Sequence, residues 1–233
     1  MRALLAAAAP AAIAAWPYTR TSEALRDWLP LVYLLIGYWL PARISGPPNP
    51  RVERWLQAFD DRWVGVTPQR FAHLGPRVAI ELLELAYLFC YPLMPIGFSW
   101  LTLHGWRGDA DRFWTSVLLA AFCCYGALPW LPTRPPRALE RQADPPRSTI
   151  RRMNMAVLKH GSVTLNTFPS GHAATALATA LAVLSRLPVD GAVFLLIALM
   201  IAVGSVVGRY HYAADAVAGL LVGIAAFAVS KLV

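Results

Sequence analysis

The sequence predicts an all-α fold in which a bundle of helices crosses a membrane. Hydrophobic residues make up 57% of the 233 residues and charged residues only 15%, and the mean hydropathy is +0.47. These values lie well away from those of an average soluble domain. Most apolar runs come close to the roughly 20 residues that a helix needs to cross a bilayer. Because lipid offers bare backbone no hydrogen-bond partner, and the alternating pattern of membrane strands is missing, we expect helices.

Six apolar runs give the expected number of core transmembrane helices. They cover residues 29–42, 79–101, 113–132, 171–187, 191–208 and 213–233. No internal repeat or low-complexity linker divides them, so we expect one transmembrane domain over residues 29–233. Ahead of it, residues 1–28 form an apolar segment and a connector. Residues 1–16 fit either an additional N-terminal helix or a signal peptide.

Two polar segments separate these runs. The first, residues 43–77, carries an apolar and a charged set on opposite faces of a helix, which predicts an amphipathic helix in the membrane interface. The apolar set is Trp55, Leu56, Phe59 and Trp63, and the charged set is Arg54, Asp60, Asp61 and Arg62. The second, residues 132–172, is long, basic and contains prolines, and loops of this kind usually bind something.

The formal net charge of +8 comes almost entirely from arginine. The arginines lie between the apolar runs, where lipid headgroups or phosphorylated substrates are nearer than nucleic acid, so we expect no nucleic-acid partner. The three cysteines lie inside apolar runs without the spacing of metal ligands, and we expect buried, inert thiols. The Ala- and Arg-rich composition indicates a bacterium, and hence a multi-pass protein of the inner membrane.

Counting the crossings places the polar side chains of interest on one membrane face. A chain that crosses twice returns to its starting side, so the segments after residue 132, before residue 171 and after residue 208 share a compartment. The residues that meet there are Arg134, Arg137, Ser170, Gly171, His172, Arg209, His211 and Asp215. Glu81 and Glu84 reach a similar depth, where we expect them to pair with arginines rather than bind an acceptor alcohol.

Two histidines on that face could do chemistry. His211 and Asp215 are four residues apart, so on a helix the carboxylate can hold one ring nitrogen and leave the other basic, as a nucleophile or base requires. A pair that only ties two helices together is the alternative. His172 begins an apolar run, where it could protonate a departing oxygen. An interfacial histidine without a catalytic role would give the same pattern.

Groups suited to phosphate surround these histidines. Ser170 fits a helix N-cap, and Gly171 lets backbone amides approach an anion closely. Arg134, Arg209 and Arg137 offer paired donors to phosphate oxygens. The set predicts a phosphoryl-transfer site. The histidines lack the further ligands that zinc needs. Apart from Glu81 and Glu84, no carboxylates on that face form a cluster suited to Mg²⁺, so we expect no metal and no cofactor.

The chain resembles the type 2 phosphatidic acid phosphatase superfamily, which shares its active site with bacterial acid phosphatases and vanadium haloperoxidases. The likeness covers roughly residues 29–233 and rests on the motifs RPP at 134–136, PSGH at 169–172 and HYAAD at 211–215. It implies that His211 is the nucleophile that forms a phosphohistidine, that Asp215 orients it and that His172 is the general acid. It also implies that Ser170 and Gly171 bind the phosphate.

Two positions depart from the family pattern. The family has lysine where Ala127 stands and arginine where Ser205 stands. Arg209 is a candidate to replace that arginine, and Arg137 or Lys159 to replace the lysine. The altered third motif, GRYHY at 208–212, is similar to the branch of inositol phosphorylceramide synthase-like enzymes, which transfer a phosphorylated headgroup between lipids rather than to water.

The leading interpretation is a metal-independent membrane lipid-phosphate phosphatase. A lipid phosphotransferase stays open, as does a catalytically silent membrane scaffold of the same fold, because two motif residues are missing. A transporter is disfavoured because no run shows the paired interruptions of transporters. Lys and Arg are more numerous on the active-site face, which favours the cytoplasm. The resemblance favours an active site outside the cytoplasm, and this is the expectation that we adopt.

Overall fold

The computed structural model describes residues 23–139, 148–163 and 165–232, and within these ranges the regular structure is helical, without β-strands. The helices are α2 (Glu23–Ile44), α3 (Pro50–Trp63), α4 (Thr67–Leu74), α5 (Arg77–Leu88), α6 (Leu93–Leu103), η2 (Arg107–Asp109), α7 (Ala110–Ala127), α8 (Pro136–Leu139), α9 (Thr149–Gly161), α10 (Gly171–Leu184), α11 (Pro188–Val207) and α12 (Ala213–Ser230). The all-α prediction is confirmed. The prediction for residues 1–16 falls outside the described residues.

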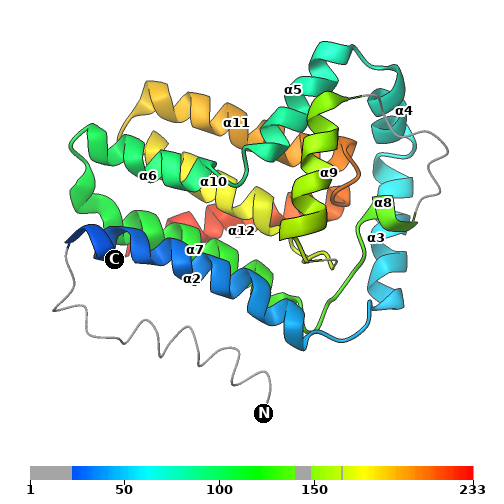
Figure 1. Cartoon of the computed structure of the whole chain (residues 1–233), viewed down its shortest axis with the longest axis horizontal. Helices are drawn as coiled ribbons and strands as arrows, with labels where there is room; N and C mark the ends of the chain where they lie inside the picture. Colours follow the sequence, from blue (N-terminus) through cyan, green and yellow to red (C-terminus); the bar gives the residue numbers. More distant parts are fainter. Residues whose placement is uncertain (1–22, 140–147, 164, 233) are drawn as a thin grey trace.

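The bundle is built around α10, which packs against α6, α7, α11 and α12 (Figure 1). Its sequence is rich in alanine, and almost all of its side chains are buried. Small residues let the backbones come close: a Cβ on Gly219 of α12 would lie 2.4 Å from the Ser170 carbonyl oxygen, and one on Gly223 would lie 2.7 Å from that of Ala174. The starts of α10 and α12 are therefore held side by side.

Helices occupy all six predicted apolar runs, but they do not all have the length of a membrane span. By length and composition, α11 and α12 could each cross a membrane, and α5 with α6 could form a third, bent span. The sequence predicted one transmembrane helix over residues 79–101. The structure instead has two helices there, α5 and α6, with a bend of 75° between them. Pro92 explains the break, because proline lacks an N–H and disfavours helical geometry at Tyr91. Within the described part of the chain this is the one bent pair of helices found, whereas transporters typically have two such interruptions.

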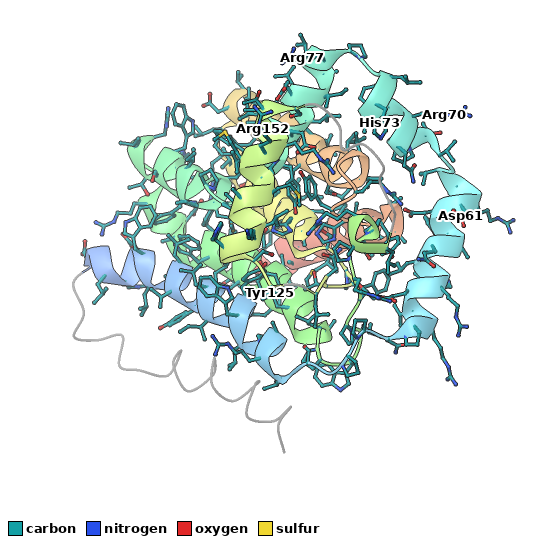
Figure 2. The ribbon with its side chains drawn as sticks, turned by 45° about the vertical axis from the view of Figure 1, so that its right-hand side comes forward. Asp61, Arg70, His73, Arg77, Tyr125 and Arg152 are labelled. Carbon is teal, nitrogen blue, oxygen red and sulfur yellow. The ribbon has the colours of Figure 1, made fainter. Side chains whose placement is uncertain are left out.

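At one end of the bundle, α3 and α4 run across the ends of the longer helices (Figure 1). The amphipathic helix predicted within 43–77 is present as α3, but its charged set does not lie on one face. Asp60 is 3% exposed, whereas Trp55 is 52% and Trp63 67% exposed. Asp61, the next residue, is exposed on the outer side of the helix (Figure 2). The inner face of α3 therefore carries charge, and aromatic rings face outward.

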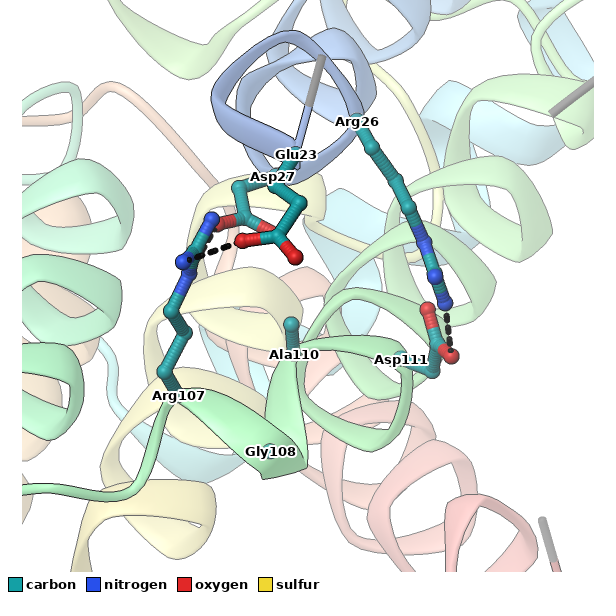
Figure 3. A pocket seen from close by; sticks show the side chains of 7 residues that line it. All are labelled: Glu23, Arg26, Asp27, Arg107, Gly108, Ala110 and Asp111. Atoms are coloured by element: carbon teal, nitrogen blue, oxygen red, sulfur yellow. Dashed lines mark hydrogen bonds and ion pairs between the residues drawn. The ribbon is translucent and has the colours of Figure 1, made fainter. Parts of the chain in front are cut away.

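At the other end of the bundle, ion pairs join the start of α2 to η2 and to the start of α7 (Figure 3). Arg107 contacts Glu23 at 2.8 Å and Asp27 at 2.7 Å, and Arg26 contacts Asp111 at 2.6 Å. These side chains line a surface pocket, but they satisfy one another's charges. Because four of these five side chains are 44% to 83% exposed, each pair contributes little to stability.

Candidate active site

The two predicted catalytic histidines are in direct contact. His172 is the second residue of α10, and His211 lies in the short connection between α11 and α12. The Nδ1 atom of His172 is 3.3 Å from the Nε2 atom of His211. The Oδ2 atom of Asp215 lies 3.3 Å from the other ring nitrogen of His211, Nδ1. The side chains of His172, His211 and Asp215 thus form a chain of three groups in contact.

Local hydrogen bonds explain why these residues meet. Ser170 is the N-cap of α10, and its hydroxyl accepts a hydrogen bond from the Ala173 amide. The Ser170 amide in turn donates to the carbonyl oxygen of Asp215 at 3.1 Å, which joins the start of α10 to the start of α12. At the end of α11, the amides of Tyr210 and His211 both donate to the carbonyl oxygen of Ser205.

A small enclosed cavity lies beside the histidine pair. Its volume is about 20 Å³, which is enough for about one water molecule. Its lining comes from α2, α5, α7, α8, α9, the segment between α9 and α10, the start of α10 and the connection between α11 and α12. It consists of Tyr38, Tyr87, Tyr125, Arg137, Leu158, Ser162, Val163, Leu165, Asn166, Thr167, His172 and His211. The cavity must therefore enlarge before it can hold a phosphate group.

The structure separates the three arginines that were predicted to bind phosphate. Arg137 lines the cavity, with its guanidinium carbon 5.2 Å from the centre of the Tyr210 ring. Arg134 instead donates hydrogen bonds to the carboxylate of Glu53 in α3, from Nη2 at 2.8 Å, from Nε at 3.0 Å and from its backbone amide. Arg209 is buried against Asp60. Of the three, Arg137 is the one positioned to reach a group held between the histidines.

The contact with Arg134 lowers the pKa of Glu53 below its ordinary value, chiefly through the hydrogen bonds from the guanidinium group. A lowered carboxyl pKa contributes stability that is complete above the ordinary pKa and is lost as the pH falls through the lowered one. We therefore expect Glu53→Gln to lower the melting temperature at pH 7. The difference from the wild type should shrink as the pH falls from about 6 to about 3.5. A difference that stays constant over this range in thermal unfolding scans would contradict the assignment.

Ser170 and Gly171 shape the site without lining the cavity. The Ser170 side chain is fully buried at the cap of α10. A Cβ on Gly171 would lie 2.4 Å from the Tyr125 ring, so the glycine is needed for that ring to pack against α10. The predicted role of both residues as phosphate ligands remains a prediction, and their packing role is what the structure describes.

The residues at the two departures from the family pattern lie apart from the cavity. Ser205 is a buried residue of α11, and Ala127 ends α7. Of the candidate replacements for the lysine, Lys159 is exposed on α9, whereas Arg137 lines the cavity. Arg137 is thus the cation that the structure brings to the histidine pair.

Asn166 was missed by the sequence reasoning. Its side-chain amide nitrogen donates to the carbonyl oxygen of Tyr210 at 2.8 Å and lies 3.3 Å from Nδ1 of His211. Asn166 is held in place by a short antiparallel bridge to Thr133. Its position three residues before the PSGH motif was the available signal, since a polar residue there shares the segment that brings His172 to the site.

A second network supports the connection that carries His211. The Tyr210 ring stacks on Tyr87 with centroids 4.1 Å apart, and its hydroxyl donates to Glu84 at 2.6 Å. Glu84 also binds Arg151 at 2.8 Å, so the predicted pairing of this glutamate with an arginine is confirmed. Among the described residues, Glu81 accepts hydrogen bonds at the start of α9 from Ser148 and two backbone amides, and none from an arginine.

The electrostatic surroundings of His211 favour the neutral imidazole. Burial, with a further contribution from the positive charge of Arg137, lowers the pKa of His211 to about 3. A neutral ring whose Nδ1–H is held by Asp215 leaves a lone pair on Nε2, which faces His172. This is the protonation state that a nitrogen nucleophile requires.

These features define a class of protein: a helical membrane bundle with a buried His–His–Asp site beside an arginine. A family model described as the PAP2 superfamily matches residues 54–229, and the chain belongs to this superfamily. The match starts within α3 and includes all three motif segments. No curated protein and no solved structure matches the chain. Within the described residues, no three His, Cys, Asp or Glu side chains gather as a metal site would require.

Proposed function

We propose that the protein is a membrane lipid-phosphate phosphatase that works through a phosphohistidine on His211. The observation that carries the proposal is the contact between His172 and His211, with Asp215 behind one ring and Arg137 beside the cavity. Membership of the PAP2 superfamily, whose members are phosphatases and phosphotransferases, supports this class of reaction.

The proposed reaction has two steps. In the first, the lone pair of His211 Nε2 attacks phosphorus, the bond from phosphorus to the lipid oxygen breaks, and the proton on His172 moves to that oxygen. In the second, water attacks phosphorus, His172 accepts its proton and the phosphorus–nitrogen bond breaks to release phosphate. Arg137 would stabilise the negative charge on the non-bridging oxygens. Asp215 would hold His211 in the tautomer that exposes Nε2.

This reaction requires the two rings to separate. An in-line displacement places the leaving oxygen on the far side of phosphorus from the attacking nitrogen. A near-attack distance of about 3–3.5 Å and a hydrogen bond of about 2.8 Å then need at least about 6 Å between the two nitrogen atoms, before the bond from phosphorus to the leaving oxygen is added. They are 3.3 Å apart in the structure. Binding of phosphate is therefore expected to part the rings and enlarge the cavity.

The second candidate is a lipid phosphotransferase of the inositol phosphorylceramide synthase-like type. The motif GRYHY favours this reaction, and the first step would be the same. An alcohol on a second lipid would replace water in the second step. A third candidate is a membrane scaffold that kept the fold without the activity.

The setting of this function is proposed with it. We propose six crossings of a bacterial inner membrane, with α5 and α6 together forming one of them, and an active site that faces away from the cytoplasm. The apolar lengths of α11 and α12 support the membrane location. The placement of α3 and α4 across one end of the bundle fits an interface at that end.

Chemical trapping tests the proposal. Purified protein in detergent, with EDTA present, is mixed with phosphatidate or polyprenyl diphosphate carrying labelled phosphate, and the reaction is quenched in alkali. We expect free labelled phosphate and a labelled peptide that contains His211, with the label lost in acid. Labelled lipid product instead of phosphate would indicate transfer. Phosphate release with the label on another residue would overturn the phosphohistidine, and no turnover on any lipid would favour the scaffold.

A further inference from the structure

The inner face of α3 carries two carboxylates where a surface helix would ordinarily pack apolar side chains. Glu53, Leu56 and Asp60 are its buried residues, and this spacing places them on one side of the helix. Glu53 forms an ion pair with Arg134. Leu56, fully buried, packs against Tyr212 and Ala214. Asp60, one turn further, lies over the connection between α11 and α12.

Asp60 holds that connection on both sides of His211. Its Oδ2 atom accepts a hydrogen bond from Nη1 of Arg209 at 3.1 Å. Its Oδ1 atom accepts one from the backbone amide of Ala213 at 2.9 Å. These donors lie two residues before and two residues after His211. A single side chain from a helix 149 positions away in sequence therefore brackets the histidine.

The backbone of Arg209 has a conformation that neighbouring contacts must stabilise. Arg209 has φ +57°, a left-handed conformation that costs a residue other than glycine about 1 kcal/mol or more. Both side chains of the pair are nearly buried, at 5% exposure for Asp60 and 7% for Arg209. A buried ion pair is weak evidence for stability, because well-packed apolar residues of similar size often serve as well. A role in fixing one conformation of the backbone accounts better for its presence.

We propose that Asp60 is a positioning residue, which fixes the Arg209–Ala213 segment so that Nε2 of His211 points at His172. The proposal rests on the function proposed above. It gives the surface helix α3 a part in the reaction, because its inner face sets the direction of the nucleophile. It also assigns Arg209 to this support rather than to the phosphate.

The test compares Asp60→Ala, Asp60→Asn and Asp61→Ala. Asp61 is the matched control, because it is the next residue of α3 and is exposed. We expect Asp60→Ala to lower kcat by roughly 10²-fold, as a displacement of about 1 Å in an active site can, while KM changes little. Asn keeps an oxygen for the Ala213 amide, so Asp60→Asn should recover part of the rate. Asp61→Ala should behave as the wild type.

A second measurement does not depend on turnover. The rate at which diethyl pyrocarbonate modifies His211, followed by peptide mass spectrometry, reports how well this segment is held. We expect modification several-fold faster in Asp60→Ala than in the wild type or Asp61→Ala, because local opening exposes the ring. Melting temperatures show whether each variant is folded.

Three results would overturn the proposal: a kcat for Asp60→Ala within twofold of the wild type, a rise in KM with kcat unchanged, or equal modification of His211 in all four proteins. If the wild type has no activity on any lipid, the proposed function fails by itself. The modification rates then still decide whether Asp60 holds the segment.

Discussion

Replacing His211 by alanine is expected to lower the rate of phosphate transfer by on the order of 10⁴-fold or more, the range seen when a nucleophile and its acid–base partner act as one unit. The reason is geometric. Its Nε2 atom is the ring nitrogen that faces His172, while Nδ1 is taken by Asp215. Without the imidazole no atom remains to form the bond to phosphorus. Steady-state phosphate release and the trapped phosphoenzyme should both disappear.

An exposed histidine provides the control. His73 lies on α4 and is exposed (Figure 2), so His73→Ala should keep full activity. Melting temperatures of both variants exclude unfolding as the cause of any loss. Phosphate transfer by folded His211→Ala at more than a small fraction of the wild-type rate would remove His211 as the nucleophile.

His172 gives a second, graded readout of the same mechanism. If it protonates the departing oxygen, His172→Ala should lose about 10²–10⁴-fold on an alkyl phosphate, the usual contribution of a general acid. The loss should be much smaller on an aryl phosphate such as p-nitrophenyl phosphate, whose leaving group needs no proton. Equal losses on both substrates would contradict the role of His172 as the acid.

The parts of this site that could be predicted from sequence are those fixed by local geometry. His211 and Asp215 are four residues apart, and their contact at 3.3 Å was expected on one helix. His211 instead lies in the connection before α12, so the contact follows from the short stretch of chain between the two residues. The all-α class follows from the cost of exposing backbone to lipid, which holds whatever the tertiary contacts. Counting crossings predicted only that His172 and His211 lie toward one membrane face. Their contact at 3.3 Å depends on the backbone hydrogen bonds of Ser170 and His211.

The parts that could not be predicted depend on partners far away in sequence. Nothing in the sequence distinguishes Arg134 from Arg137 as a phosphate ligand. In the structure Arg134 is hydrogen-bonded to Glu53, 81 positions earlier in the chain, whereas Arg137 lines the cavity. Asp60 was assigned to a solvent-facing set because the neighbouring residues are charged. Its burial is decided by Arg209 and the Ala213 amide, which no local pattern in α3 reveals.

Contacts between residues far apart in sequence also predict that substitution of Glu84 lowers the stability of the fold strongly. Its carboxylate accepts hydrogen bonds from Arg151 at 2.8 Å, from Asn154 at 2.8 Å and from the hydroxyl of Tyr210 at 2.6 Å. All four side chains are buried. Glu84→Ala would leave a buried guanidinium without its counter-charge, which costs about 3–5 kcal/mol. For a chain of this size that corresponds to a drop of roughly 6–20 °C in melting temperature.

Glu81, three residues earlier on α5, is the matched comparison. It accepts hydrogen bonds from the Ser148 hydroxyl and the amides of Thr149 and Ile150, so it caps the start of α9, and it forms no ion pair with the residues that the structure describes. Glu81→Ala should therefore cost only about 0.5–2 kcal/mol, the usual range for a lost cap. Thermal unfolding in one detergent should rank Glu84→Ala well below Glu81→Ala.

A double substitution separates lost charge from lost packing. If the stranded charge of Arg151 causes most of the damage, Glu84→Leu combined with Arg151→Met should melt at a higher temperature than Glu84→Leu alone, since apolar pairs often replace buried ion pairs well. Equal melting temperatures for Glu84→Ala and Glu81→Ala, or no recovery in the double variant, would show that this network is not the support for α9 and Tyr210. Without the hydrogen bond to Glu84, Tyr210 would no longer fix the position of His211, the next residue. Activity in Glu84→Ala should therefore fall even where the protein remains folded.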